Sequence, residues 1–161
     1  MSYIEKNLMN GEVIVYRGKL HWVIFIWPVI WAVVAALAFI NGLAGANTSS
    51  VDNMFGMLFL LIAAVTGISS WLTYTTSEFA ITNKRVVVKV GFIRINSLEV
   101  LLNKVEGIQV NQGILGRILG YGSITVSGTG GSKDPFHRID APLEFRKHAQ
   151  EQISSVQDSK L

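Results

Sequence analysis

Two long apolar segments in the first half of the chain, Trp22–Leu43 and Met54–Tyr74, contain no charged side chain. Each is close to the ~20 residues that an α-helix needs to cross about 30 Å of hydrocarbon. The connection between them has no Lys or Arg, and its only charge is Asp52. We therefore expect a membrane α-helical hairpin, with residues 22–43 and 54–74 as spans and residues 44–53 as the outer loop.

The basic residues predict the orientation of this hairpin. Eleven of the fourteen Lys and Arg residues follow the second span. The other three precede the first span: Lys6, Arg17 and Lys19. Positive charge marks the cytoplasmic flanks of membrane spans, so we expect both termini in the cytoplasm. Residues 1–21 then form a cytoplasmic segment, in which the apolar run at residues 13–16 predicts a short strand.

A cleaved signal peptide is the competing interpretation. Ala44-Gly45-Ala46 follows the first apolar stretch and has the small residues of a cleavage site. The stretch is longer than the roughly 7–15 residues of a signal-peptide core, and a second apolar stretch follows it. We therefore prefer two membrane spans.

The apolar excess is confined to the first 74 residues, although hydrophobic residues make up 50% of the whole chain and charged residues 16%. Residues 75–161 are enough for one small water-soluble domain. The chain has no cysteine, which excludes disulfides, thiolate nucleophiles and Cys-ligated metals. We expect a membrane hairpin joined to a single compact module.

Short alternating apolar runs after the second span predict strands. A hairpin of β-branched residues is expected over residues 79–90, with its turn at Asn83-Lys84. Further strands are expected around residues 92–102, 105–110 and 124–126. Residues 143–156 have helical spacing, and Asp140-Ala141-Pro142 before them suits the beginning of a helix. The pattern predicts an α+β domain, a small β-barrel or sandwich capped by a C-terminal helix.

Several motifs are spread over nearly the whole chain. They are Gly11-Glu12-Val13 with His21-Trp22, Phe79–Arg85 followed by Gly91, Gln112–Gly122 and Gly128–Gly131. Together they resemble the bacterial pleckstrin-homology-like (PH-like) domain family, and in particular its membrane-anchored members with two N-terminal spans. The resemblance implies a seven-stranded, strongly bent antiparallel sheet closed by a C-terminal helix, on the cytoplasmic side of a bacterial inner membrane. It supplies no catalytic residues.

No arrangement of residues indicates an enzyme. Gly128–Lys133 lacks the spacing of a phosphate-binding loop and the Ser or Thr after the lysine, so a hairpin tip is the plainer interpretation. Three histidines stand far apart in the sequence, with no paired carboxylate at ligand spacing: His21, His137 and His148. We expect no catalytic residue, no metal site, no cofactor and no nucleic-acid partner.

Four basic residues on or beside the first predicted hairpin are candidates for contact with a lipid surface: Lys84, Arg85, Lys89 and Arg94. A basic cluster near a membrane attracts anionic headgroups by about 1 kcal/mol per residue. The plainer interpretation is that alternate strand positions keep charge in water. Nothing in the sequence specifies a headgroup.

Two further sets of residues are candidates for packing. An apolar turn between glycines either tucks into the core, which is the plainer interpretation, or offers a patch to a neighbour: Ile114, Leu115, Ile118, Leu119 and Tyr121. Small residues four apart let helices approach closely in lipid, within the hairpin or against a second copy: Ala32, Ala36, Ala63 and Gly67.

Two functions from different classes remain open. The first is a membrane-anchored, non-enzymatic binding or assembly module, whose domain holds another membrane protein, further copies in a homo-oligomer, or the membrane lipid surface. The alternative is a component of a transport or channel assembly formed by several copies. No ionisable side chain falls inside either span, which disfavours an ion path.

Overall fold

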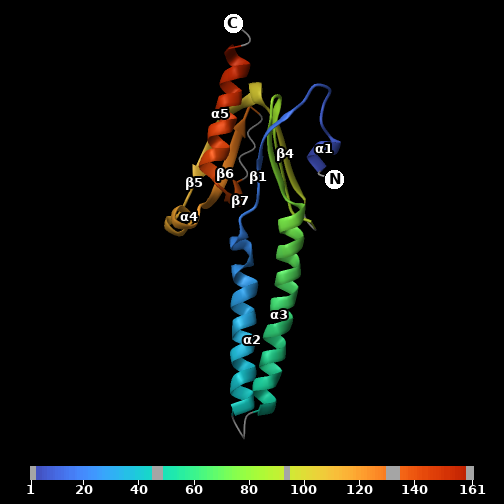
Figure 1. Ribbon diagram of the computed structural model, residues 1–161, viewed down its shortest axis with the longest axis vertical. Coiled ribbons are helices and arrows are strands. Elements are labelled where there is room, and N and C mark those ends of the chain that lie inside the picture. Colours follow the sequence, from blue (N-terminus) through green and yellow to red (C-terminus); the bar gives the residue numbers. More distant parts are fainter. Residues whose placement is uncertain (1–2, 45–48, 93–94, 130–134, 159–161) are drawn as a thin grey trace. The chain divides into compact units, whose positions relative to one another are not determined.

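The chain folds into two compact units (Figure 1). The computed structural model describes residues 3–44, 49–92, 95–129 and 135–158. One unit, here called the helical unit, is Trp22–Thr75, and the other, here called the β unit, is Met1–His21 together with Thr76–Leu161. The helical unit is therefore an insertion, in sequence, within the β unit.

The helical unit contains two long helices. A 3₁₀ turn, η1 (Trp22–Phe25), precedes α2 (Ile26–Ala44), and α3 (Ser49–Thr76) follows. Both helices are long and apolar enough to cross a membrane. α3 begins before the predicted start of the second span at Met54, and Asp52 lies in its first turn, where a carboxylate interacts favourably with the helix dipole.

Aromatic rings and small residues join α2 to α3. A Cβ atom on Gly56 would lie 3.1 Å from three ring carbons of Phe39, so the absence of a side chain at Gly56 lets that ring lie against α3. Trp31 and Phe59 stack with their ring centroids 5.7 Å apart. Side-chain packing of this kind drives helix association where the surroundings are as apolar as the helices.

The small residues singled out from the sequence lie on different faces. Ala63 and Gly67 of α3 are half-buried. Ala32 and Ala36 of α2 are exposed, and the fully buried alanine of that helix is Ala35, at 1% exposure. The predicted faces on α2 and α3 therefore do not form one matched pair.

Four antiparallel strands form the first sheet of the β unit, in the order β1-β2-β3-β4. They are β1 (Ile14–Gly18), β2 (Glu78–Thr82), β3 (Arg85–Val90) and β4 (Asn96–Leu101). β1 and β2 are neighbours, with Gly18 opposite Phe79, so the helical unit replaces the turn of a β-hairpin. Phe92 and Ile95, expected to lie in a strand, precede β4, which begins at Asn96, and residues 93–94 of that expected strand lie outside the described residues.

Three strands form the second sheet, in the order β5-β6-β7. They are β5 (Val105–Asn111), β6 (Tyr121–Gly128) and β7 (Pro135–Asp140). A short helix, α4 (Ile114–Leu119), joins β5 to β6, and a 3₁₀ turn, η2 (Leu102–Lys104), joins the two sheets. The seven strands among the described residues form two separate ladders, so the expected bent sheet is confirmed but it does not close into a barrel.

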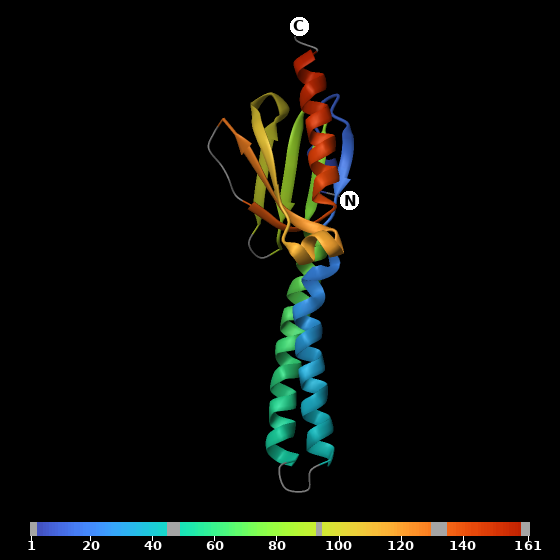
Figure 2. The same ribbon diagram turned by 90° about the vertical axis from the view of Figure 1, so that its left-hand side faces the viewer.

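The C-terminal helix α5 (Pro142–Asp158) covers the inner faces of both sheets (Figure 2). Phe145 and Ala149 of this helix are fully buried. A Cβ atom on Gly18 would lie 3.2 Å from the Phe145 ring, which shows how closely α5 approaches β1. On β6 every second residue is buried, as expected for a strand with one face on the core.

The opposite face of the first sheet is covered by the N-terminal segment. Ile4, in the four-residue helix α1 (Tyr3–Lys6), forms a cluster with Ala80 and Val87, and Leu8 and Ile14 pack against it. β2 and β3 are consequently buried on both faces and lack the alternation of a half-exposed strand. The sequence did not predict α1.

Candidate functional site

The turn between β2 and β3 fastens the N-terminal segment to the sheet. The Asn83 N–H donates to the Val13 carbonyl at 3.1 Å, and Asn83 Oδ1 accepts from the Val13 N–H at 3.0 Å. Asn83 Nδ2 donates to the Gly11 carbonyl at 3.1 Å, and Lys84 Nζ donates to the Asn10 carbonyl at 2.5 Å. Polar side chains of the turn thus replace a further strand as the partner of residues 10–13.

Arg85 lies at the centre of a buried ion-pair network. Its Nε is 2.9 Å from Glu12 Oε1, and its Nη1 is 2.6 Å from Glu99 Oε2. Nη2 donates to the Asn7 carbonyl at 2.5 Å, and the Thr82 hydroxyl donates to Glu12 Oε1 at 2.8 Å. The side chains of Arg85 and Glu12 are 8% and 0% exposed. A buried ion is tolerated only when its hydrogen-bonding capacity is used in this way.

Both central groups of this network are held in their charged forms. Burial opposes the ionisation of Glu12, but hydrogen bonds from the Met9 N–H, Arg85 and Thr82 outweigh it, so the pKa of Glu12 lies below its usual value. Burial also opposes the charge of Arg85, but the hydrogen bond to Glu12 and the charge of Glu99 raise the pKa of Arg85. Arg85 therefore has a structural role, because its guanidinium is occupied by Glu12, Glu99 and the Asn7 carbonyl and is not available to a lipid headgroup.

The other basic candidates do not join Arg85 in one cluster. Lys84 lies in the turn before β3, and Lys89 lies near the other end of that strand, about 16 Å away at roughly 3.3 Å per residue. Lys89 Nζ is 4.0 Å from the centre of the Tyr3 ring, a cation–π contact. Arg94 lies outside the described residues.

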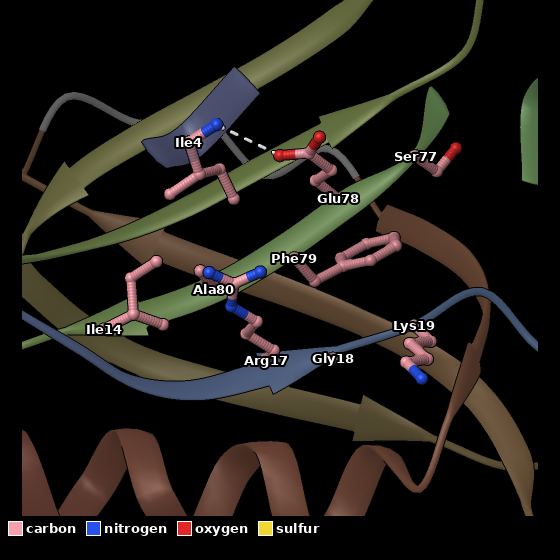
Figure 3. Close-up of a pocket in the computed structure, with 9 residues that line it drawn as sticks. All are labelled: Ile4, Ile14, Arg17, Gly18, Lys19, Ser77, Glu78, Phe79 and Ala80. Carbon is pink, nitrogen blue, oxygen red and sulfur yellow. Dashed lines mark hydrogen bonds between the residues drawn. The ribbon is translucent and has the colours of Figure 1, made fainter. Parts of the chain in front are cut away.

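A pocket of about 190 Å³ lies beside β1 and β2 (Figure 3). Its lining comes from α1 and the two strands: Ile4, Ile14, Arg17, Gly18, Lys19, Ser77, Glu78, Phe79 and Ala80. The Glu78 carboxylate points toward the first turn of α1 and accepts hydrogen bonds from the Tyr3 and Ile4 N–H groups at 2.9 and 3.0 Å. Arg17 pairs with Glu5. These contacts hold α1 against the sheet, so both charged side chains of the lining that they involve, Arg17 and Glu78, are already paired.

α4 presents glycine to the β unit and large apolar side chains to the outside. Ile114, Leu115 and Ile118 are 82%, 65% and 75% exposed, and we call these three residues the α4 apolar surface. Gly116 is buried, and it lies so close to β6 that a Cβ atom there would be only 2.5 Å from the Tyr121 carbonyl oxygen. An ordinary amphipathic helix would place its apolar side chains inward. The apolar turn identified in the sequence is therefore outside the core.

The end of α4 is tied to the segment that enters the helical unit. Gly120, with φ +84°, ends the helix in the left-handed conformation, and its carbonyl accepts a hydrogen bond from the Ala141 N–H at 3.0 Å. The preceding Asp140 N–H donates to the Lys19 carbonyl at 3.0 Å. Lys19 stands three residues before Trp22, where the helical unit begins.

A second set of exposed apolar side chains, Phe92 and Ile95, follows β3. Phe92 and Ile95 are 53% and 57% exposed. The Gly91 N–H donates to the Ser77 hydroxyl at 3.3 Å, and Ser77 directly follows Thr76, the last residue of α3. The sequence had assigned this segment to a strand and did not single out these side chains.

A family model described as a bacterial PH domain matches residues 14–153, which include the whole helical unit and most of the β unit. The chain belongs to the bacterial PH domain family. No curated protein and no solved structure matches the chain significantly. The resemblance found in the sequence is thus confirmed.

In this bacterial PH domain two stretches that carried the resemblance have structural explanations. Residues 79–85 hold the N-terminal segment, and residues 112–122 shape α4 and its junction with β6. Sequence reasoning did not find the roles of Glu12 and Glu99. Glu12 had a signal, since it belongs to the Gly11-Glu12-Val13 motif, whereas Glu99 had only the alternation of β4.

The three histidines of the bacterial PH domain lie in separate environments. His148 stacks on Tyr16 with ring centroids 4.6 Å apart, and His137 Nδ1 is 2.9 Å from the Ser123 hydroxyl on the exposed face of the second sheet. His21 is buried beside Tyr121. Within the part of the chain that the structure describes, no three His, Asp or Glu side chains gather as a metal site requires.

Proposed function

We propose that this protein is a membrane-anchored binding module without enzymatic activity. Residues 22–43 and 54–74 cross a bacterial inner membrane, residues 44–53 form the outer loop, and residues 75–161 form a cytoplasmic PH-like domain with residues 1–21. The domain holds a partner at the membrane face: another membrane protein, further copies of the chain, or the lipid surface. PH-like domains are binding modules, which supports this class of function.

The surfaces of α2 and α3 support the membrane anchor. In the most apolar stretch of each helix, only 11% of the first and 6% of the second are buried. Large apolar side chains on these helices are mostly exposed: Trp27 is 59%, Ile40 60% and Leu61 59% exposed. A helix that is apolar all round requires surroundings other than water.

The single observation that carries the binding function is the α4 apolar surface. Three large aliphatic side chains on a six-residue helix are left outside the core, while glycine occupies the inward position. Contiguous exposed apolar side chains mark protein or membrane contacts. We therefore assign the contact with the partner to Ile114, Leu115 and Ile118, with Leu119 and Tyr121 at its edge.

Cysteine accessibility in native membranes tests this assignment, because the chain has no cysteine of its own. Ile118→Cys reports on the α4 apolar surface, and Val13→Cys, at a residue that is 63% exposed just before β1, is the matched control. We expect a water-soluble maleimide to label Ile118→Cys severalfold more slowly than Val13→Cys, each rate being normalised to the urea-unfolded protein. Equal normalised rates would contradict a contact role for α4.

The hydroxyl groups of the helical unit argue against the alternative of a transport path. The Thr73 hydroxyl donates to the Ser69 carbonyl at 2.8 Å, and the Ser70 hydroxyl donates to the Ile24 carbonyl at 3.3 Å. These groups are therefore used within the hairpin instead of lining a polar pathway. A transport component also needs a route for its substrate, and ionisable side chains that usually mark one are absent from both apolar segments.

A further inference from the structure

We propose that α4 inserts its apolar surface into the headgroup layer of the same bilayer that α2 and α3 cross. The β unit would then be held on the membrane by a third, interfacial contact in addition to its two covalent connections. This inference rests on the proposed membrane anchor, and it names the lipid surface as the partner of the α4 apolar surface.

The connectivity of the β unit identifies which of its ends faces the bilayer. β1 and β2 are paired neighbours, and the chain leaves β1 after Gly18 and returns to β2 at Glu78. Neighbouring strands lie about 4.8 Å apart, so both covalent connections to the helical unit leave from the same end of the first sheet. With the proposed membrane anchor, that end of the β unit is the one covalently joined to the spans, so we expect its side chains to be nearest to the bilayer.

α4 lies at this end, as contacts within the β unit establish. The ring of Tyr121, two residues after α4, is 5.4 Å from the ring of His21. His21 directly precedes Trp22, the first residue of the helical unit. The His21 N–H also donates to the Arg138 carbonyl at 2.7 Å, which fixes this segment to β7. The junction of α4 with β6 is therefore next to the point where the chain enters the first span.

Phe92 and Ile95 give an independent indication of the same surface. They follow β3, and the Gly91 N–H is bonded to the hydroxyl of Ser77, the first residue after α3. Exposed apolar side chains thus accompany both connections to the helical unit, one set at α4 and one beside Ser77. Two separate apolar sets at the same end of the β unit suit a flat partner such as a lipid surface.

The charge of α4 favours lipid over a protein groove as this partner. Arg117 is exposed between Leu115 and Ile118, and no Asp or Glu occurs from Asn111 to Thr129. Arginine can bury its aliphatic stem at a membrane interface while its guanidinium reaches the phosphates. α4 therefore combines an apolar surface with one basic and no acidic side chain, and elements that lie in the membrane interface likewise combine apolar and basic side chains.

A dye in single-copy nanodiscs tests the inference. Full-length Ile118→Cys carries an environment-sensitive fluorophore, and the discs contain phosphatidylcholine and phosphatidylglycerol with or without a quencher on the acyl chains. Val13→Cys is the control, since Val13 precedes β1 and so lies at the opposite end of that strand from Gly18. We expect the dye at residue 118 to emit at shorter wavelength than the dye at residue 13 and to be quenched severalfold more than that dye by the lipid-borne quencher. Aqueous iodide should quench the dye at residue 13 more strongly.

Leu115→Cys is a second reporter in case Ile118→Cys impairs folding, and it should behave as Ile118→Cys does. If both dyes on α4 respond like the dye at residue 13, the inference is wrong. If they are shielded only in discs with two copies, the occupant is a second copy, and the inference again fails. If Ile118→Cys is labelled slowly in native membranes but either of these two nanodisc results is found, only the lipid contact is wrong and the proposed binding function stands. Fast labelling of Ile118→Cys in native membranes would contradict both the proposed function and the lipid contact.

Discussion

Arg85 connects three parts of the chain that are distant in sequence. It contacts Asn7 and Glu12 from the N-terminal segment and Glu99 from β4. Because Arg85 and Glu12 are buried, removal of one partner leaves the other charge uncompensated, which costs roughly 3–5 kcal/mol in comparable buried pairs. Glu99 is 40% exposed, so water screens its contribution.

Arg85→Met should therefore lower the free energy of unfolding by about 3 kcal/mol or more. The matched control is Lys147→Met, at an exposed position on α5, for which we expect a change within about 0.5 kcal/mol. Urea unfolding of the detergent-solubilised chain, followed by circular dichroism, measures both. Equal unfolding midpoints for the two variants would show that the network does not stabilise the fold.

Glu12 makes part of this stability dependent on pH. Although burial opposes its ionisation, hydrogen bonds from Met9, Arg85 and Thr82 hold the pKa of Glu12 below the ordinary value of 4.5. A group with a lowered pKa contributes stability that is fully present above its unfolded pKa and is lost as the pH falls through its folded pKa. We expect Glu12→Gln to be less stable than the wild type at neutral pH. This difference in stability should shrink as the pH falls below 4.5. Urea midpoints over a pH series measure the difference, and a gap that widens on acidification would contradict the assignment.

At the scale of single elements, α4 depends on the absence of a side chain at one position. Its inward residue, Gly116, faces the backbone of Tyr121, and a Cβ atom there would lie 2.5 Å from the Tyr121 carbonyl oxygen. That atom belongs to the backbone of β6 and cannot rotate away. The close approach of helix to strand keeps the α4 apolar surface turned outward.

Gly116→Ala should destabilise the β unit by about 1–3 kcal/mol, as overpacking typically does. Gly113→Ala is the control, because a Cβ atom at Gly113 meets nothing within 4 Å and its φ of −70° suits alanine. Urea unfolding compares the two. If Gly113→Ala were the more harmful substitution, the close contact between Gly116 and Tyr121 would not be the constraint described above.

The sequence predicted those elements whose side chains follow a regular period. The hairpin of β2 and β3, strands β5 and β6, and helix α5 all agree with the apolar spacing of their residues. α1 was missed because four residues are too few to show a period, and its main contact with the sheet is made by Ile4 alone. Periodicity describes the faces of an element but not its partners, so it could not place Arg85 inside or α4 outside.

The lipid-contact candidates show the same limit. The three described candidates are close in sequence but do not form one cluster. Lys84 lies just before β3 and Lys89 near the other end of that strand, while the ion pair with Glu12 holds Arg85 inside. The partner Glu12 comes from before the two spans, at a sequence separation of 73 residues. A contact between such distant residues has no local signal in a single sequence.

At the scale of the whole molecule, the arrangement of strands links the fold of the β unit to the proposed membrane anchor. β1 precedes the helical unit and β2 follows it, and the two strands are paired. If α2 and α3 cross a bilayer as proposed, the β unit can be completed only when residues 14–18 and residues 78–161 lie on the same side of it. An even number of spans between β1 and β2 satisfies this requirement, which agrees with the two apolar helices.

The most direct test of this account is the sidedness of the chain in intact bacterial cells. A membrane-impermeant maleimide should label Asn47→Cys, between α2 and α3, from outside the cell, and should label Gln157→Cys on α5 only after the cells are permeabilised. Labelling of Gln157→Cys in intact cells, or equal labelling of both positions without permeabilisation, would contradict a membrane-anchored domain on the cytoplasmic side.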